Sequence, residues 1–362
     1  MRIATVFLLL LAAGCGRERM RPTGPTEGDA GAIAGEAGTN AEAGALADDA
    51  AVVPPDSTVP PAAFETFLED TRLGLVREVW SAGPRDTWLV TATGQVVHWT
   101  GGTSPDSWDF GIGLHAVHGT SPTDVWVSGD DGTVASYDAS DRSFIPVGDR
   151  LTFGPLLDTW GDASTRYVAG ELYGDLKYAT SPYLDSYTTF EVQDGRGGRL
   201  SGDTHCVAGT ASGLWVCGED ALYGYDGEWH HIFGGSGSAS GGRPFRVAPV
   251  GASLALALDE RAVTLVSFRE VALSGGFGPV SLPIPPGVDA WDGPRLRGVW
   301  GDSTEVWVVG TRGYVARMTG YTSFSASWER IDVGTTADLE SIYADSESIW
   351  IGGDSLVLRR DR

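Results

Sequence analysis

The sequence predicts an all-β fold made of seven similar repeats, and three observations carry that prediction. A unit of Val-Trp, a polar turn and Val-Trp-Val-Gly recurs along the chain, as in GVWGDSTEVWVVG at 298–310. Its second aromatic position returns every 38 to 52 residues, at Trp88, Trp126, Tyr167, Trp215, Ala255 (a weak copy), Trp307 and Trp350. Several short runs with strand-like alternation, separated by turn residues, fall inside each repeat. A mean period near 44 residues with four strands per copy indicates a seven-bladed β-propeller.

Residues 1–15 are expected to be a processing signal rather than part of the fold. Arg2 supplies a basic start, and 4–13 form an apolar run too short to span a bilayer. The ending LAAGC at 11–15 resembles a bacterial lipoprotein signal, with Cys15 as the lipidated new N-terminus. That resemblance implies a membrane anchor of acyl chains such as palmitate. Gly16 after the cysteine implies the outer membrane, and an ordinary cleaved secretory signal is the alternative.

Residues 16–61 are predicted to be a disordered linker. Ala, Gly, Pro, Glu and Asp dominate the segment, which contains no aromatic residue. Such a composition cannot bury enough apolar surface to offset the entropy of ordering. At roughly 5–6 Å × √n the linker reaches about 35–40 Å. Residues 62–362 remain for the propeller, and their number is ample for a sizeable core.

The second repeat shows the expected order of strands in a blade. The run LHAVHG precedes the turn TSPTD, and the strand VWVSG follows. A tight Asp-Asp-Gly turn then suits positive φ, and TVASYD and SFIPVG complete four strands.

The last repeat stops after its third strand, at Arg362, which would leave an open sheet edge. An extra strand, FETFL at 64–68, stands ahead of the first repeat. It precedes LVREVW as WERID precedes LESIYA in the last junction. We therefore expect residues 63–69 to form the outer strand of blade seven and close the ring.

The VWG…DVWVVG units over about 75–362 resemble the propeller repeats of predicted bacterial surface lipoproteins. That group is defined by its repeats, so the resemblance implies a fold and a location and little about activity. The fifth copy departs from the pattern because both motif aromatics are missing.

Most of the tryptophans recur at equivalent strand positions, which predicts packing between blades rather than a ligand-stacking surface. Trp291, in the irregular stretch PIPPGVDAWDGPRL, is the exception and a candidate for ligand contact.

Acidic residues cluster in the turns between second and third strands, which share one face with the blade-to-blade connections. That face also carries the longest insertions, GGSGSASGGRP and the stretch around Trp291. The candidate binding face consists of Asp130, Asp131, Glu219, Asp220, Asp259, Glu260, Asp354 and Trp291. Such a face fits a cation or a basic partner. Turn formation and solubility are the simpler explanation, because no copy has the spacing of a calcium loop.

Catalysis finds little support in the sequence. No G-x-S-x-G, H-E-x-x-H or phosphate-loop motif occurs, and His230 and His231 are adjacent on a strand and point to opposite faces. We therefore expect no enzyme, no cofactor and no metal. The net charge of −23 argues against nucleic acid as a partner and favours a soluble monomer.

Cys206 and Cys217 flank the turn in CVAGTASGLWVC, about equally far from its centre. In an exported protein this arrangement predicts a disulfide, with two separate buried thiols as the alternative.

Taken together, the sequence predicts a lipid-anchored, non-catalytic module that binds a protein or a glycan. One alternative is a periplasmic scaffold, resembling the propeller lipoprotein of the outer-membrane β-barrel assembly machinery. The other is a glycan-active enzyme, which would need a deep central pocket with paired acids.

Overall fold

The structure is a computed structural model of the 362-residue chain. It describes residues 63–362 apart from 148–151, 153, 173–174, 181–186, 194–197, 199, 201, 220, 235–243, 268–278, 289–291 and 322–325. The predicted signal, the linker and Cys15 lie outside the described residues, as do Asp220 and Trp291 of the predicted binding face.

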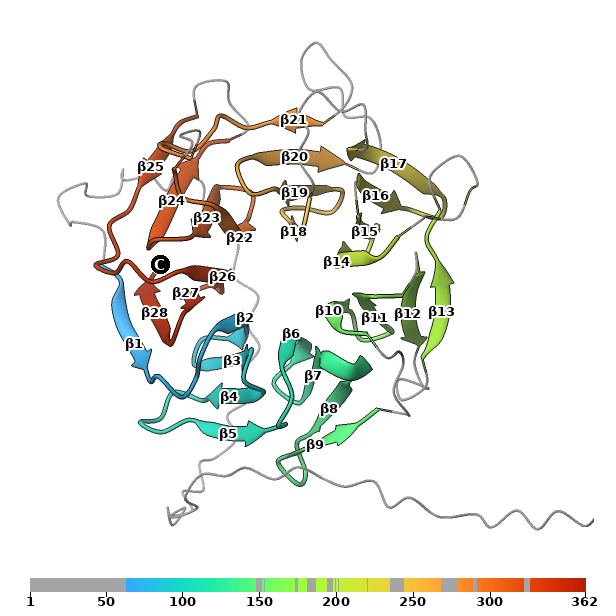
Figure 1. The fold of residues 1–362 in the computed structure, drawn as a ribbon, viewed down its shortest axis with the longest axis horizontal. Helices are drawn as coiled ribbons and strands as arrows, with labels where there is room; N and C mark the ends of the chain where they lie inside the picture. Colours follow the sequence, from blue (N-terminus) through green and yellow to red (C-terminus); the bar gives the residue numbers. More distant parts are fainter. Residues whose placement is uncertain are drawn as a thin grey trace, which may run out of the picture.

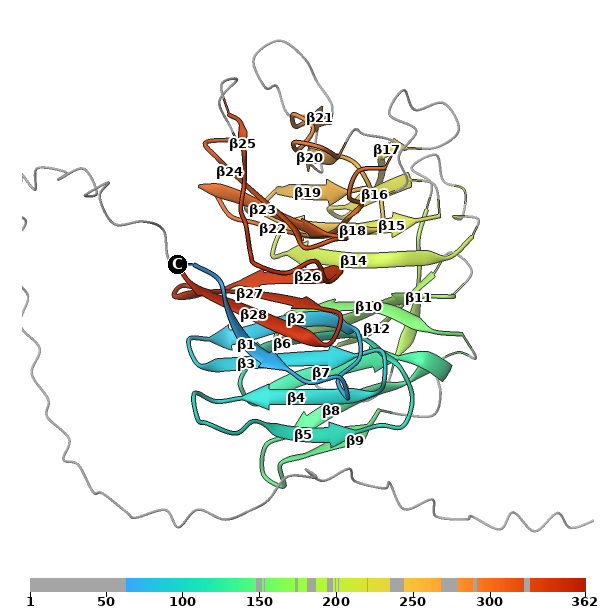
Figure 2. The same cartoon turned by 60° about the vertical axis from the view of Figure 1, so that its left-hand side comes forward.

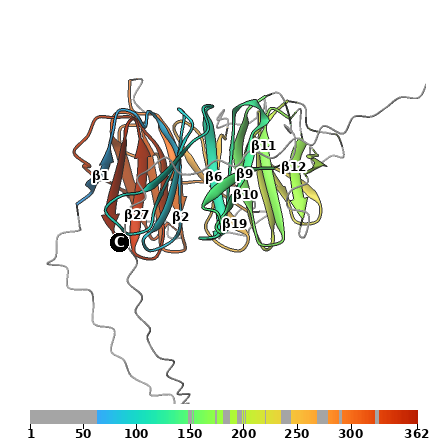
Figure 3. The same ribbon diagram turned by 90° about the horizontal axis from the view of Figure 1, so that it is seen from below.

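The described strands form seven four-stranded antiparallel sheets arranged as blades around a central axis (Figure 1). The inner strand of each blade lies beside that of the next blade, and the last lies beside the first, so that the ring is closed. Viewed from the edge, the ring is a short cylinder (Figure 3). The predicted seven-bladed β-propeller is confirmed.

Each blade contributes one strand to each of four concentric layers. The inner strands of blades 1 to 7 are β2 (Val76–Gly83), β6 (Leu114–Ser121), β10 (Leu156–Gly161), β14 (Thr204–Thr210), β18 (Arg246–Pro249), β22 (Leu296–Gly301) and β26 (Leu339–Ala344). The second strands are β3 (Asp86–Thr91), β7 (Asp124–Gly129), β11 (Thr165–Gly170), β15 (Gly213–Gly218), β19 (Leu254–Leu258), β23 (Glu305–Gly310) and β27 (Ser348–Gly353). The third strands are β4 (Gln95–Trp99), β8 (Val134–Asp138), β12 (Asp175–Thr180), β16 (Ala221–Tyr225), β20 (Val263–Ser267), β24 (Tyr314–Thr319) and β28 (Leu356–Asp361). The outer strands are β5 (Asp106–Asp109), β9 (Ser143–Pro146), β13 (Thr188–Glu191), β17 (Trp229–Gly234), β21 (Val280–Ser281), β25 (Trp328–Arg330) and, for blade 7, β1 (Glu65–Glu69). A short 3-10 turn, η1 (Asp130–Gly132), follows β7.

Blade 7 is completed by the N-terminal strand. β1 pairs antiparallel with β28, giving the sheet order β1-β28-β27-β26 (Figure 2). Phe67 of β1 packs edge-on against Trp99 and Trp350, with ring centroids 5.0 Å apart in each case. The predicted closure by 63–69 is confirmed, and the paired strand begins at Glu65.

A cross-strand row of four directly paired side chains crosses the blades from the channel outward. In blade 6 it consists of Trp300, Trp307, Arg317 and Glu329, in blade 7 of Tyr343, Trp350, Arg359 and Glu65, and in blade 1 of Trp80, Trp88, His98 and Asp106. Arg317 lies over Trp307 with its guanidinium carbon 5.5 Å from the ring centroid, and His98 stacks on Trp88 at 3.6 Å. In blades 6 and 7 an arginine therefore lies over the buried second-strand ring, as in cation–π pairing, and in blade 1 the ring of His98 stacks on it.

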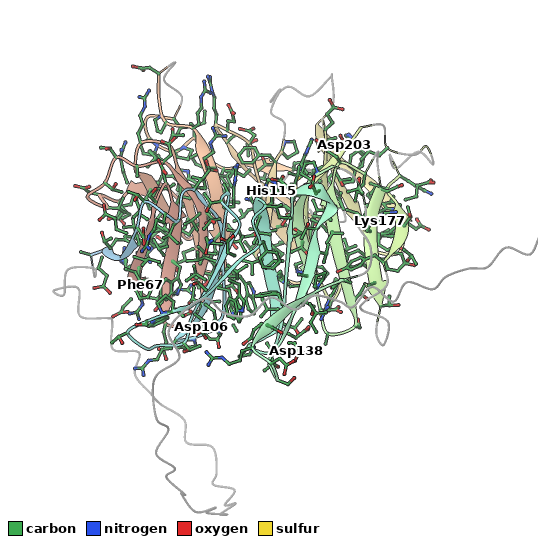
Figure 4. The ribbon with its side chains drawn as sticks, turned by 60° about the horizontal axis from the view of Figure 1, so that its bottom comes forward. Phe67, Asp106, His115, Asp138, Lys177 and Asp203 are labelled. Atoms are coloured by element: carbon green, nitrogen blue, oxygen red, sulfur yellow. A yellow bond between two sulfur atoms is a disulfide. The ribbon has the colours of Figure 1, made fainter. Side chains whose placement is uncertain are left out.

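The two faces of the ring differ in the chain segments that they carry. Because successive strands are antiparallel, the turns between first and second strands and between third and fourth strands share the lower face. The remaining turns and the blade-to-blade connections lie on the upper face. In Figure 4, Asp106 and Asp138 mark the lower face, and His115 and Asp203 mark the upper face.

Candidate functional site

The ring encloses a central channel with a cavity volume of about 300 Å³. All seven inner strands line it, because each blade turns its inner edge toward the axis. Six of the seven described inner strands carry a β-bulge after their first residue, and β18 does not. Bulges redirect side chains and increase twist. The side chains that reach the channel are therefore set by the backbone of each strand as well as by its sequence.

Glu78, Asp158 and Arg246, from three blades, lie in this channel, and Glu340 is a fourth charged residue of its lining. Arg246 of blade 5 reaches across to blade 1, where its Nη1 lies 3.6 Å from Glu78 Oε1 and its Nη2 donates to the Arg77 carbonyl oxygen at 3.5 Å. The backbone N–H of Val117, in the next blade, donates to Glu78 Oε2 at 3.0 Å.

Asp158 has the same role at an interface further around the ring. The N–H of Val207 in blade 4 donates to Asp158 Oδ2 at 2.9 Å, and the N–H of Thr159 donates to Oδ1 at 2.8 Å. Glu78 and Asp158 thus accept hydrogen bonds from backbone N–H groups on the inner strand of the following blade, whose inner edge has no neighbouring strand in the same sheet. Buried donors of this kind need a partner, so both carboxyls join neighbouring blades.

Burial shifts the protonation of both carboxyls. Loss of solvation raises the pKa of Glu78 well above its ordinary value, the nearby charge of Asp158 adds to this, and Arg246 offsets part of it. Burial likewise raises the pKa of Asp158, against the opposing effects of Arg246 and the two N–H donors. A carboxyl that keeps its proton near neutrality can donate a hydrogen bond or act as a general acid.

Aromatic side chains line the channel near the lower-face end of the inner strands. They are Trp80, His118, Trp160, Trp300 and Tyr343, contributed by five blades. All but Trp80 are partly exposed, whereas the tryptophans of the second strands, such as Trp126, are fully buried. Sequence reasoning assigned Trp160 and Trp300 to packing between blades. Both rings do pack against hydrophobic clusters, and their partial exposure also leaves some ring surface at the channel.

His118 belongs to this aromatic set and is held neutral. Burial lowers the pKa of His118 to about 4, and its Nε2–H donates to the Gly161 carbonyl oxygen at 3.1 Å. Its ring lies 5.9 Å from that of Trp80 and 6.3 Å from that of Trp160. The three rings therefore form an apolar arc rather than a titrating site near neutral pH.

The described acids of the predicted binding face lie in upper-face turns, and several are engaged there. Asp130 Oδ1 is 2.8 Å from His115 Nε2, and Asp259 Oδ1 accepts from the N–H groups of Arg261 and Ala262 at 2.7 Å. Asp131 adopts φ of 56°, as the expected tight turn requires.

The remaining described acids of that face also have neighbours. Glu260 lies 3.7 Å from Arg295 Nη1, and Ser355 Oγ donates to Asp354 Oδ1 at 3.2 Å. Glu219 lies in the turn after β15, beside Gly202. Whether this face binds a partner stays a prediction.

Cys206 and Cys217 are directly opposite each other in β14 and β15 and form a disulfide. His230 pairs with Asp226 at 2.8 Å, and His231 faces the other side of the strand, beside Tyr223. Among the described residues no group of three or more His, Cys, Asp or Glu side chains is placed to hold a metal ion. The described residues include no helix long and apolar enough to cross a membrane.

Sequence reasoning missed Glu78, Asp158 and Arg246 as channel residues. Glu78 and Asp158 each stand two residues before the aromatic of the first strand, so a comparison of the seven first strands could have singled them out. Arg246 lies in the copy that lacks the motif aromatics, and no pattern predicts that its side chain crosses the channel.

The sequence matches no protein-family model and no curated protein. Solved structures share the fold. YCF48 from Cyanidioschyzon merolae covers 83% of this chain and 99% of its own at a TM-score of 0.63 and 13% identity. A catalytically inactive virginiamycin B lyase from Staphylococcus aureus, solved with quinupristin, covers 83% and 99% at 0.65 and 9%. An extracellular domain from B. thetaiotaomicron, assigned to a one-component system, covers 82% and 40% at 0.59 and 13%. Identities this low show the fold alone.

Proposed function

We propose that the chain is a lipid-anchored binding module of the outer membrane, which recognises a protein or a glycan without catalysis. The observation that carries the binding role is the set of partly exposed rings at the channel, among them Trp160, Trp300 and Tyr343. The second-strand tryptophans are fully buried, whereas these channel rings keep exposed surface that a partner can contact.

The proposed location rests on the N-terminal sequence and on chemistry typical of exported proteins. Cys15 follows the apolar run as the lipid-attachment residue, and residues 16–61 serve as the linker that lets the ring stand away from the membrane. The disulfide between Cys206 and Cys217 supports an oxidising compartment. An extracellular domain and a YCF48 solved with the D1 peptide are among the structures of similar fold, which supports a recognition role.

Crosslinking on intact cells with a membrane-impermeant reagent, followed by pull-down and mass spectrometry, tests this function. We expect capture of the chain together with a surface component, and loss of membrane retention in Cys15→Ser. Gly16→Ala changes the neighbouring residue and keeps the cysteine, so it is the matched control and should stay with the membrane. Capture of barrel-assembly partners only after permeabilisation would favour the periplasmic scaffold instead.

A glycan-active enzyme is a second candidate, because Glu78 and Asp158 place two carboxyls with raised pKa in one channel. Each carboxyl already accepts backbone N–H groups of the next blade, which favours a structural role. Release of reducing sugar from an oligosaccharide by the wild-type chain, abolished in Glu78→Gln, would establish the enzyme. We expect no release.

A further inference from the structure

The interface between blades 3 and 4 carries two adjoining hollows. The inner hollow, of about 230 Å³, is lined by Trp160, Tyr167, Leu214 and Tyr225 among others. The outer hollow, of about 540 Å³, is lined by Phe190, Tyr225 and Trp229 among others. Trp160 also lines the channel, and Tyr225 lines both hollows. We call these hollows together the blade 3–4 groove.

Beside the groove, the cross-strand row of blade 3 lacks the charged half that blade 6 has. The row consists of Trp160, Tyr167, Tyr178 and Thr188, so that a tyrosine and a threonine stand where blade 6 has Arg317 and Glu329. No guanidinium lies over Tyr167 among the described residues. Its ring is therefore not covered as that of Trp307 is.

Three rings of the blade 3 row lie nearly parallel to one another at the edge of a hydrophobic cluster. Trp160 and Tyr167 are 6.2 Å apart with 23° between their planes, and Tyr167 and Tyr178 are 6.0 Å apart with 24°. Phe190, Tyr225 and Trp229 continue the aromatic surface outward at centroid distances of 5.0 to 5.4 Å. All six rings are partly exposed.

The charges around the groove restrict the ligand. Asp162 and Asp226 line the inner hollow and Glu191 and Glu228 line the outer one, whereas no Lys, Arg or His is among the described lining residues. An anionic ligand would meet only like charge there. Carboxylates and the hydroxyls of Thr165 and Ser212 instead offer hydrogen-bond partners to a ligand rich in hydroxyl groups.

We propose that the blade 3–4 groove binds a neutral glycan chain, whose sugar rings pack against the aromatic side chains that line it. The proposal deepens the binding function proposed above by naming its ligand class and surface. A proline-rich peptide also docks against aromatic rings. A polyproline chain, however, has no N–H or hydroxyl group to donate to the carboxylates of the lining, whereas a sugar has several.

Isothermal titration of the purified full chain with three neutral hexasaccharides (of N-acetylglucosamine, β-linked glucose and α-linked glucose) tests the proposal. We expect at least one to bind. The double variant Y178R/T188E, which rebuilds the row of blade 6 and covers Tyr167, and the variant Trp229→Ala should each bind roughly tenfold more weakly or not at all. Trp99→Ala, which removes a partly exposed ring of blade 1 that lines neither the channel nor the groove, is the matched control and should bind as the wild type does.

Three outcomes overturn the proposal: no binding of any hexasaccharide, binding that survives unchanged in both groove variants, or binding of a decaproline peptide in place of the sugars. Thermal unfolding of each variant checks that a loss of binding is not a loss of fold. If no sugar binds while intact-cell crosslinking still captures a surface partner, the glycan assignment fails and the binding module stands.

Discussion

Blades 7 and 3 represent two kinds of blade. In the first kind a basic side chain covers the second-strand ring of the cross-strand row, and in the second kind that ring is left partly exposed. In blade 7 the row runs Tyr343, Trp350, Arg359 and Glu65, and Arg359 lies over the ring of Trp350 at 5.4 Å. In blade 3 the corresponding side chains are aromatic or small, and every ring of the row is partly exposed. The basic side chain thus completes the packing of one blade, and its replacement leaves the other with a surface that a ligand can use.

The ring is closed in blade 7, a blade whose second-strand ring is covered by a basic side chain. Glu65 of β1 ends the row of blade 7, with its Oε1 4.0 Å from Arg359 Nη1, and Phe67 packs on Trp350. An exposed ion pair of this kind contributes little by itself. The buried aromatic contacts and the strand pairing are what hold β1 in place.

Deleting residues 63–69 should have the largest effect on stability. Without β1 the sheet of blade 7 loses its outer strand and β28 exposes an open edge. We expect loss of the cooperative unfolding transition, measured by circular dichroism on heating. A deletion within 16–61 is the control and should leave the transition in place. An unchanged melting temperature without β1 would show that the ring does not depend on closure.

Replacing the second-strand aromatic residue by alanine should destabilise the two kinds of blade by different amounts. Trp307 is 1% exposed, so Trp307→Ala should cost about 3–5 kcal/mol of unfolding free energy through the cavity it leaves. Tyr167 is partly exposed, so Tyr167→Ala should cost only about 1 kcal/mol. Urea unfolding measures both values. Equal losses would mean that the row of blade 3 is core after all.

The disulfide links the first two strands of blade 4, whose cross-strand row contains small residues. In blade 4 the row contains Ala208 and Gly224 on either side of Trp215, so little side-chain packing crosses the sheet there. Replacing Cys206 and Cys217 together by alanine should cost at most about 3 kcal/mol, as expected for a loop this short. Urea unfolding measures the change in unfolding free energy. The wild type with its disulfide reduced is the control, and it should lose about as much stability as the double alanine variant.

The buried acid of blade 1 predicts a smaller, pH-dependent effect. The fold raises the pKa of Glu78 to about 8, so the unfolded chain releases this proton at lower pH than the folded chain. Stability should therefore fall as the pH rises, by on the order of 1–2 kcal/mol. The fall is measured between pH 6.5 and about 8. Over the lower part of that interval His118, with an ordinary pKa of 6.5, loses its remaining charge in the unfolded chain and gives an opposing rise in stability. That rise is common to the wild type and a Glu78 variant and cancels in their difference.

Glu78→Gln isolates this effect, because glutamine keeps an oxygen that can accept from Val117 but does not titrate. The difference in unfolding free energy between variant and wild type should grow in favour of the variant across that interval. Parallel pH profiles for the two proteins would contradict the assignment.

Local repetition made the architecture predictable. Trp307 and its counterparts recur at nearly constant spacing, and the strand at 64–68 matches the missing element of the last repeat, so the blade number and the closure could be derived. The disulfide followed from two cysteines placed symmetrically about one turn.

The site was less predictable because it depends on differences between copies. The contact of Arg246 with Glu78 joins residues 168 positions apart across the channel, and no local pattern encodes it. Tyr178 and Thr188 are unremarkable in sequence, and they gain meaning only when strand register places them opposite Tyr167 and its neighbours.

Urea unfolding of Y178R/T188E tests most directly whether the side chain in the third strand decides between a packed row and an open one. If Tyr178 serves the groove and not the core, an arginine there should cover Tyr167 as Arg317 covers Trp307. The unfolding free energy should then be unchanged or about 1 kcal/mol higher than that of the wild type. A loss of more than about 2 kcal/mol would place Tyr178 in the core and contradict the division between the two kinds of blade.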